Sequence, residues 1–271
     1  DQANALEGED SVVFDDALTG QIMRVSDELM VNDPLIINGL GQNQLTIVRV
    51  FDEESDMNNT NLFVTDDDLT LNDITLTGVS ADIDNLIDAR GSESDDPKSK
   101  LTITRSQLDN SAAPASSFIR GVKSNFFDVD ISESNLQNYN GNSFGYSNVS
   151  ITRSNLQYAR SSQIGISNST LNLSASNVLN NRSSKGAIYV GSNNQINIDD
   201  TLFDGNSRGY YGGSAILIES NDASITIRNS SFLNSDQSIG AFNTYSFNDT
   251  STLTFEIDNC VFDNHSSRAL I

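Results

Sequence analysis

One ten-residue pattern of apolar and polar positions recurs eight times along the chain. An apolar residue, any residue and a second apolar residue are followed by four mostly polar residues, a third apolar residue, any residue and usually asparagine. The copies are LTLNDITLTG from Leu69, LTITRSQLDN from Leu101, VDISESNLQN from Val129, VSITRSNLQY from Val149, LNLSASNVLN from Leu171, INIDDTLFDG from Ile196, ITIRNSSFLN from Ile225 and FEIDNCVFDN from Phe255. Such repetition, every 20 to 32 residues, predicts a solenoid in which each unit packs on its neighbours.

Positions one, three and eight of the pattern are apolar in all eight copies. Alternation with period two, in short runs rich in Ile, Val, Leu and Thr, predicts strands, and these offsets do not fit a helix. They fit two strands that meet at a bend and point their apolar side chains into one interior. A charge at such a position, for example at Leu156, should therefore be severely destabilising.

Position six is small and polar in all copies but one, and alternation places it with position eight, facing inward at the bend. Its residues are Ile74, Ser106, Ser134, Ser154, Ser176, Thr201, Ser230 and Cys260. We expect the stacked hydroxyls to hydrogen-bond to one another. Cys260, the only cysteine, then substitutes for serine in this column, in preference to a role as a reactive thiol.

Position ten is asparagine in five copies, which are Asn110, Asn138, Asn180, Asn234 and Asn264. Asparagine tolerates a left-handed backbone and can cap a turn, and stacked asparagines can form a hydrogen-bond ladder. These residues are therefore predicted to be architectural, without a ligand.

A third apolar run lies between the copies, at Leu62–Val64, Leu86–Ala89, Ile164–Ile166, Ile188–Val190, Ile216–Ile218 and Ile239–Ala241. Three strands per cycle predict an all-β, single-stranded parallel β-helix of about ten coils, with earlier coils at Leu35–Ile37 and Leu45–Ile47. We divide the chain into residues 1–34, an N-terminal segment and cap that includes Ser11–Val31, and residues 35–271, the β-helix. The final residues Arg268–Ile271 read as part of a strand, so the β-helix is expected to be truncated at its C-terminal end.

Composition limits the partners of this solenoid. Fifteen basic and 37 acidic residues give a formal charge of −22 and a pI near 4.1. Such a surface repels nucleic acid and anionic membranes, which are polyanions. No apolar run approaches the ~20 residues of a membrane-spanning helix, so we expect no membrane insertion by this segment. The lone cysteine excludes an intramolecular disulfide.

Four acidic clusters offer hard oxygen ligands: Asp15–Asp16, Asp66–Asp68, Asp95–Asp96 and Asp199–Asp200. None has the spaced, glycine-punctuated layout of a dedicated calcium loop. We therefore expect no cofactor and no structural metal, while a weak surface calcium site stays open.

Parallel β-helices also host polysaccharide lyases and hydrolases, which need a base and often a bound calcium. His265 is the only histidine and reads as a solvated residue after the turn at Asn264. Asp199, Arg228 and Asp258 come closest to a catalytic cluster on the outward positions of adjacent coils. We interpret them as cross-strand ion pairs on a solvated face, and predict no catalytic residues.

The loop Arg208–Gly213 lies outside the repeat pattern and is the one segment for which we form a binding hypothesis. Tyr210 and Tyr211 form the only adjacent tyrosine pair, between glycines and beside the basic Arg208. Tyrosines in such a setting can stack on sugar rings or anchor a protein partner, whereas the plainer interpretation is that a tyrosine packs over the base of the loop. We name Arg208, Tyr210 and Tyr211 as candidate ligand-binding residues.

Two further motifs carry a resemblance. Lys185–Ile188 and Gly212–Ile216 approximate a Gly-Gly-Ala-Ile tetrapeptide, and Phe203–Asn206 is a Phe-x-x-Asn tetrapeptide. Together with the repeat, which spans most of residues 35–271, they resemble the right-handed parallel β-helix passengers of bacterial surface proteins, especially the polymorphic outer-membrane protein type of autotransporter. The resemblance implies a right-handed coil, a bacterial origin and an extracellular or cell-surface location.

The sequence thus favours a non-catalytic, exported surface adhesin or autotransporter-type passenger that presents loops to a host or cell-surface glycan or protein. The alternative is a carbohydrate-active β-helix enzyme, a lyase or hydrolase that acts on an acidic polysaccharide. A purely structural spacer is a third hypothesis. The sequence does not give the oligomeric state.

Overall fold

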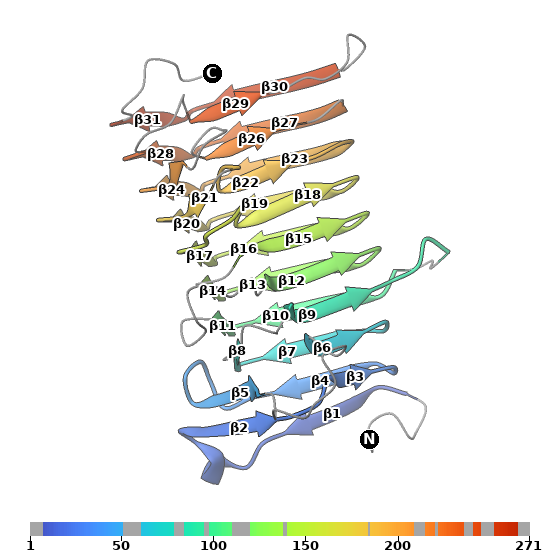
Figure 1. The fold of residues 1–271 in the computed structure, drawn as a ribbon. Helices are drawn as coiled ribbons and strands as arrows, with labels where there is room; N and C mark the ends of the chain where they lie inside the picture. The colour runs from blue at the N-terminus through green and yellow to red at the C-terminus, as the bar shows by residue number, and fades with distance from the viewer. Residues whose placement is uncertain are drawn as a thin grey trace. The chain divides into compact units, whose positions relative to one another are not determined.

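A computed structural model describes residues 8–50, 61–78, 84–94, 98–109, 120–137, 140–183, 185–208, 215–219, 222–235, 241–244 and 252–264. The chain divides into two compact units, Asp1–Tyr139 (unit 1) and Asn140–Ile271 (unit 2). Both units are built almost entirely of strands (Figure 1). None of the described residues belongs to a helix long and apolar enough to cross a bilayer.

Unit 1 stacks its strands into three parallel sheets, A, B and C. Sheet A holds β1 (Asp10–Val13), β4 (Leu35–Asn38), β7 (Leu69–Asn72), β10 (Lys100–Thr104) and β13 (Asp128–Ser132). Sheet B holds β2 (Gln21–Val25), β5 (Leu45–Arg49), β8 (Thr75–Gly78), β11 (Gln107–Asp109) and β14 (Asn135–Gln137). Sheet C holds β3 (Leu29–Val31), β6 (Asn61–Thr65), β9 (Asn85–Arg90) and β12 (Arg120–Asn125), and a short 3₁₀ helix, η2 (Asp16–Leu18), precedes β2.

Unit 2 repeats the same plan of three parallel sheets. Sheet A holds β16 (Asn148–Thr152), β19 (Thr170–Ser174), β23 (Asn194–Asp199), β27 (Asp222–Arg228) and β30 (Thr252–Asp258). Sheet B holds β17 (Asn155–Gln157), β20 (Asn177–Leu179), β24 (Leu202–Asp204), β28 (Ser231–Leu233) and β31 (Val261–Asp263). Sheet C holds β15 (Asn142–Gly145), β18 (Ile164–Ser167), β22 (Ile188–Val190), β26 (Ile216–Ile218) and β29 (Phe242–Thr244), and β21 (Arg182–Ser183) pairs separately with β25 (Ser207–Arg208).

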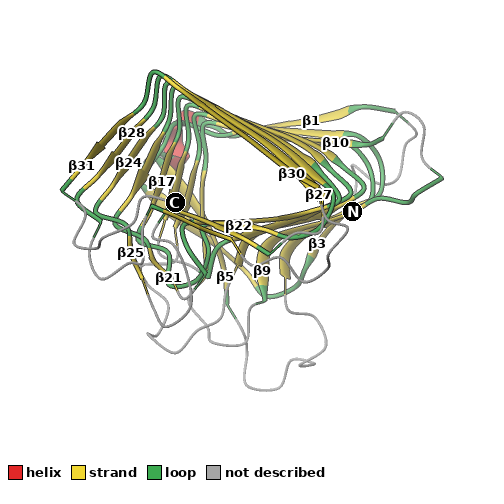
Figure 2. Ribbon diagram, turned by 90° about the horizontal axis from the view of Figure 1, so that it is seen from above, coloured by secondary structure: helices red, strands yellow, loops and turns green. Residues whose placement is uncertain are grey.

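This arrangement confirms the predicted parallel β-helix with three strands per coil and about ten coils. Positions one to four of each repeat lie in sheet A and positions seven to nine in sheet B, so the bend falls at positions five and six. The repeats pair in the register that the pattern predicts: Leu101 is opposite Leu69, and Ile196 is opposite Leu171. Within each unit, the strands of the three sheets surround an interior (Figure 2).

The predicted apolar columns form that interior. Positions one, three and eight are at most 1% exposed in the seven repeats from Leu69 to Phe232, and Leu156 is fully buried. In the last repeat, Phe255, Ile257 and Phe262 are half-buried. Position eight becomes an aromatic stack, because the rings of Phe203, Phe232 and Phe262 lie nearly parallel with centroids 4.7 and 5.0 Å apart.

Sheet C departs from the sequence prediction in two ways. Five predicted runs fall within β6, β9, β18, β22 and β26, whereas Ile239 and Gly240 of the sixth lie outside the described residues, and the strand described there is β29, Phe242–Thr244. The strands β3, β12 and β15 were not predicted. β12 reads RGVKSN and has one aliphatic residue, Val122, while its other inward position is the buried Ser124. Apolar alternation is therefore too short there to indicate a strand.

Each bend from sheet A to sheet B turns on a residue with a left-handed backbone. Position five has a positive φ in all eight repeats: Asp73, Arg105, Glu133, Arg153, Ala175, Asp200, Asn229 and Asn259, with φ between 46° and 55°. The predicted left-handed turn at position ten is confirmed at Asn180, Asn234 and Asn264, with φ from 50° to 55°. The bend at position five was not predicted, because four of its eight residues, Arg105, Glu133, Arg153 and Ala175, are not left-handed formers.

The position-six column faces inward as predicted, but its hydroxyls do not bond to one another. Each donates to the backbone carbonyl two residues before it, as Ser176 Oγ does to Ser174 O at 2.7 Å. The hydroxyls of Ser106, Ser134, Ser176 and Ser230 also accept from the position-six N–H of the preceding coil, as Ser176 Oγ does from Ser154 N at 3.1 Å. Cys260 follows the same pattern, with its Sγ 3.2 Å from Asp258 O, which confirms it as a serine substitute.

Asparagine ladders run along the coils. In the predicted ladder, Asn264 Nδ2 donates to Asn234 Oδ1 at 2.6 Å, and Asn234 donates to Asp204 at 2.8 Å. A second ladder is fully buried, where Asn181 Nδ2 donates to Asn206 Oδ1 at 3.0 Å and Asn206 Nδ2 donates to Val178 O at 2.7 Å. Asn206 of the Phe-x-x-Asn motif is thus a structural residue.

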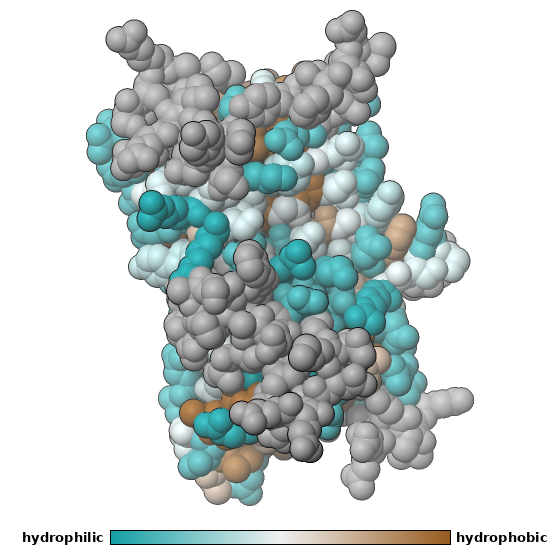
Figure 3. Space-filling view, in the orientation of Figure 1, coloured by the Kyte–Doolittle hydropathy of each residue, from teal (hydrophilic) through white to brown (hydrophobic). Residues whose placement is uncertain are grey.

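The first strands of unit 1 already have the register of a coil. β1 pairs with β4, β2 with β5 and β3 with β6, so the segment Ser11–Val31 that the sequence assigns to a cap contains three strands in parallel register. A hollow of about 360 Å³ lies among Val12, Met23, Leu29, Ile47 and Phe63. Brown, apolar surface is visible over these coils (Figure 3). The domain boundary at residues 34 and 35 stays a prediction.

Leu156→Asp should abolish cooperative folding, because it places a carboxylate in a fully buried apolar column. The loss of the leucine side chain alone costs about 2–5 kcal/mol. Asn172→Asp is the matched control, since residue 172 is exposed and an aspartate keeps the oxygen that accepts from Asn197. Thermal unfolding followed by circular dichroism tests both variants, and an unchanged melting temperature for Leu156→Asp would refute the register.

Ala175→Gly should raise the free energy of unfolding by about 1 kcal/mol, because Ala175 has φ 47° and is exposed. Ala175→Val should lower it, since a β-branched residue is disfavoured in this conformation. Urea titration of both variants measures whether the free energy of unfolding rises for Ala175→Gly and falls for Ala175→Val. Equal stabilities would mean that the bend does not require a left-handed residue at position five.

Candidate functional site

The loop predicted to bind a ligand begins at the end of a described strand. Arg208 is the last residue of β25, which pairs with β21, and the described chain resumes at Ala215 before β26. Tyr210 and Tyr211 lie outside the described residues, as does the side chain of Arg208. Their role in binding therefore stays a prediction, while the strands that flank the loop can be examined.

A third tyrosine, Tyr189, lies on the strand next to β26 in sheet C. Its hydroxyl donates to Glu219 Oε2 at 2.9 Å, and the Lys185 Nζ lies 4.3 Å from the centre of its ring. Tyr189 is paired in register with Gly165 and Leu217, and a Cβ on Gly165 would meet only the Asn142 carbonyl oxygen, at 3.5 Å. We call Lys185, Tyr189 and Glu219 the aromatic face.

The environment of the aromatic face raises the pKa of Tyr189 to about 12. Burial is the largest cause, because it disfavours the phenolate, and the hydrogen bond to Glu219 and the charge of that carboxylate act in the same direction. The phenol is therefore protonated at neutral pH, and its O–H is held by Glu219. The face combines an aromatic ring, a carboxylate and an ammonium group on one rigid element.

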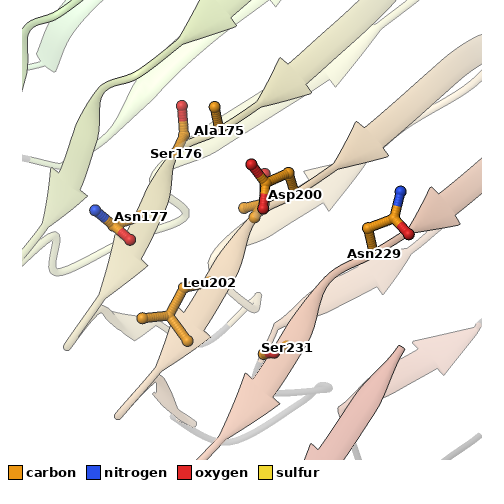
Figure 4. A pocket seen from close by; sticks show the side chains of 8 residues that line it. Ala175, Ser176, Asn177, Asp200, Leu202, Asn229 and Ser231 are labelled. Atoms are coloured by element: carbon orange, nitrogen blue, oxygen red, sulfur yellow. The ribbon is translucent and has the colours of Figure 1, made fainter. Parts of the chain in front are cut away.

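A second candidate site is a hollow of about 300 Å³ on the outside of the bend between sheets A and B of unit 2 (Figure 4). It is lined by positions five to seven of three successive repeats: Ala175, Ser176, Asn177, Asp200, Thr201, Leu202, Asn229 and Ser231. Figure 4 shows Asp200 between the strand of Asn177 and the strand of Ser231. We call this hollow the bend groove.

The cluster of Asp199, Arg228 and Asp258, which came closest to a catalytic site in the sequence, contains an ion pair, but Arg228 pairs with Glu256 and with neither aspartate. Arg228 lies between Asp199 and Asp258 in register, as predicted, but its guanidinium pairs with Glu256 at 3.0 Å. The Asp199 carboxylate accepts from Asn229 Nδ2 at 2.8 Å. The hydrogen bond to Glu256 raises the pKa of Arg228, so this residue stays cationic and is no candidate for a base. His265 lies outside the described residues.

The acidic clusters that the structure describes hydrogen-bond to the backbone. Asp15 Oδ1 accepts from Ala17 N at 2.8 Å at the start of η2, and Asp68 Oδ1 accepts from Lys100 N at 2.6 Å at the start of β10. Within the described ranges, no three His, Cys, Asp or Glu side chains are placed to hold a metal ion. Asp95 and Asp96 lie outside these ranges, so calcium binding stays an open hypothesis.

The described part of unit 1 contains one buried carboxylate flanked by two cations. Asp88 has a side chain that is 2% exposed, and it lies 2.7 Å from Arg90 Nη2 and 3.4 Å from Lys123 Nζ. Both cations thus pair with the same buried carboxylate on sheet C of unit 1.

No family model, no curated protein and no solved structure matches this chain. The two candidate sites are therefore described by their own geometry. Neither was found from the sequence. Tyr189 lies inside a run that was correctly predicted as a strand, and Lys185 is four residues before it, but Glu219 is brought to it only by the coil. The bend groove draws its residues from three repeats, 25 to 29 residues apart, and contains no motif.

The phenol of Tyr189 should titrate near pH 12, whereas tyrosines of an unfolded chain titrate near pH 10. Its contribution to stability is therefore complete below about pH 10 and is lost as the pH rises through about 12. The difference in phenolate absorbance between the wild type and Tyr189→Phe measures this pKa. Glu219→Gln should lower it, and a wild-type difference midpoint near pH 10 would contradict the contact.

Proposed function

We propose that this chain is a non-catalytic, exported surface adhesin or autotransporter-type passenger, which binds a glycan or protein partner through the aromatic face and the loop beside it. The observation that supports the proposal is the combination of Tyr189, Glu219 and Lys185 on one outward face. A ring that can stack on a sugar, a carboxylate acceptor and an ammonium donor are the groups that a saccharide site needs.

The position of the face on the fold gives a second reason. Tyr189 lies on β22, and Glu219 follows β26 and donates its backbone N–H to Val190 O at 2.8 Å. The segment that carries Tyr210 and Tyr211 connects β25 to β26. A solenoid holds such a segment on a rigid scaffold, which lowers the conformational entropy lost on binding.

Binding to a glycan array should fall at least ~10-fold for Tyr189→Ala, because a stacked tyrosine contributes on the order of 2 kcal/mol. The double variant Tyr210→Ala with Tyr211→Ala should show a similar loss. Thr226→Ala, on the outward side of sheet A, is the control and should bind like the wild type.

Three outcomes would contradict this proposal. Retained binding in both tyrosine variants would exclude the aromatic face and its loop. Absence of binding to every glycan and to host-cell proteins would favour the spacer. Release of unsaturated product from uronate polymers in the presence of calcium would identify a lyase and replace the adhesin.

A further inference from the structure

The bend between sheets A and B leaves one backbone group outside the ladder in every coil. The position-five N–H donates to the next coil, as Ala175 N does to Asp199 O at 3.2 Å. The position-six N–H donates to a stacked hydroxyl. The position-seven N–H donates to the preceding coil, as Asn177 N does to Ser154 O at 2.9 Å. This scheme assigns no partner to the position-five carbonyl.

In unit 1 the chain itself supplies that partner. The segment Gly39–Gln44, which connects β4 to β5, lies along the bend of the coils that follow. Its backbone donates from Gly39 N to Asn72 O at 2.8 Å and from Gly41 N to the position-five carbonyl of Asp73 at 2.7 Å. Gly39 is required, since a Cβ there would clash with the Asp73 carbonyl oxygen.

The side chain of Gln42 extends this contact across two further coils. Its amide nitrogen donates to Ser106 O at 3.2 Å and to the position-five carbonyl of Glu133 at 3.1 Å. Its carbonyl oxygen accepts from Asn135 Nδ2, at position seven, at 3.1 Å. The amide of Gln42 thus donates to two backbone carbonyls of the bend and accepts from one side-chain amide there.

Unit 2 presents the same groups at the bend groove, where no described segment lies. Ala175, Asp200 and Asn229 have φ of 47°, 47° and 52°, against 52° for Glu133, so these bend residues share the left-handed backbone of their unit 1 counterpart. Among the described residues nothing donates to these three carbonyls. Asn177 takes the place of Asn135, and only one of its two amide hydrogens is committed, to Asn155 Oδ1 at 2.8 Å.

We propose that the bend groove of unit 2 binds an extended polypeptide segment of another protein, which carries a glutamine or asparagine side chain between small residues. A peptide is favoured over an N-acetylated sugar because the occupant of unit 1 uses several backbone N–H groups in addition to one side-chain amide. The groove also contains the carboxylate of Asp200, so it selects segments without acidic residues. This site is separate from the aromatic face and does not depend on its function.

The test uses the blocked peptide GLGQNQ, the sequence of Gly39–Gln44, added to the ¹⁵N-labelled full chain. We expect saturable shifts of amide signals at positions five to seven of the repeats that begin at Leu171, Ile196 and Ile225. The dissociation constant should be on the order of 1 mM, since a six-residue segment forms few hydrogen bonds. The peptide GLGLNQ should bind ~10-fold more weakly, as should GLGQNQ to Asn177→Asp, which keeps the shape but loses the donor.

Asn172→Asp, outside the groove, is the matched control and should bind the peptide like the wild type. Circular dichroism establishes that each variant is folded before its binding is compared. The proposal is overturned if GLGQNQ causes no shifts at the groove, or if GLGLNQ binds equally well. It is also overturned if an N-acetylglucosamine oligomer, and not the peptide, shifts these signals, because the groove then recognises a glycan.

Discussion

The structure depends on how each of the eight repeats turns from sheet A to sheet B at a single left-handed residue. Such a residue removes its neighbours from the strand ladder, and a buried N–H without a partner costs about 1–3 kcal/mol. The position-six hydroxyl supplies that partner: it accepts from the coil before and donates within its own coil, as Ser176 does. The same hydrogen-bond demand recurs at every bend, which explains why the column is Ser, Thr or Cys from Ser106 onward.

The hydrogen bonds of the bend leave different polar groups on the inside and on the outside of the solenoid. Inside, the apolar columns and the buried amides of Asn181 and Asn206 are fully used by the fold. Outside, the carbonyl at position five remains, and the two units treat it differently. In unit 1, Gly39–Gln44 donates to it at Asp73 and Glu133, whereas no described residue of unit 2 donates to it at Ala175, Asp200 or Asn229, which line the bend groove. The left-handed bend thereby leaves a row of carbonyl acceptors, one per repeat, to which a peptide could donate hydrogen bonds.

Most of the fold could be predicted from the sequence because the same apolar positions recur in every repeat and form the interior. The left-handed bend residues, two strands of sheet C and the contact of Tyr189 could not be predicted, because they depend on neighbouring coils. Arg105, Glu133 and Ala175 carry no local preference for a left-handed backbone, and the register of two adjacent coils imposes it on them. Likewise, β12 and β15 have one large apolar residue each, Val122 and Phe144, and become strands because β9 and β18 offer them an edge. Tyr189 was found as a strand residue, but its contact with Glu219 depends on the coil length between them.

Candidate binding residues in such a solenoid are best sought where one residue differs from those at the same outward position of neighbouring coils. A residue that matches its neighbours is already explained by stacking. In sheet C of unit 2, the column through Ser143 and Gly165 is small and then admits the ring of Tyr189. At the bend, position five has no fixed residue type, and Asp200 places a carboxylate between Ala175 and Asn229. Cys260 is the only cysteine and Asn206 belongs to the Phe-x-x-Asn motif, yet both follow their columns and have structural hydrogen bonds. Rarity in the sequence and departure from the column are therefore different signals, and only departure exposes a group that the fold does not use.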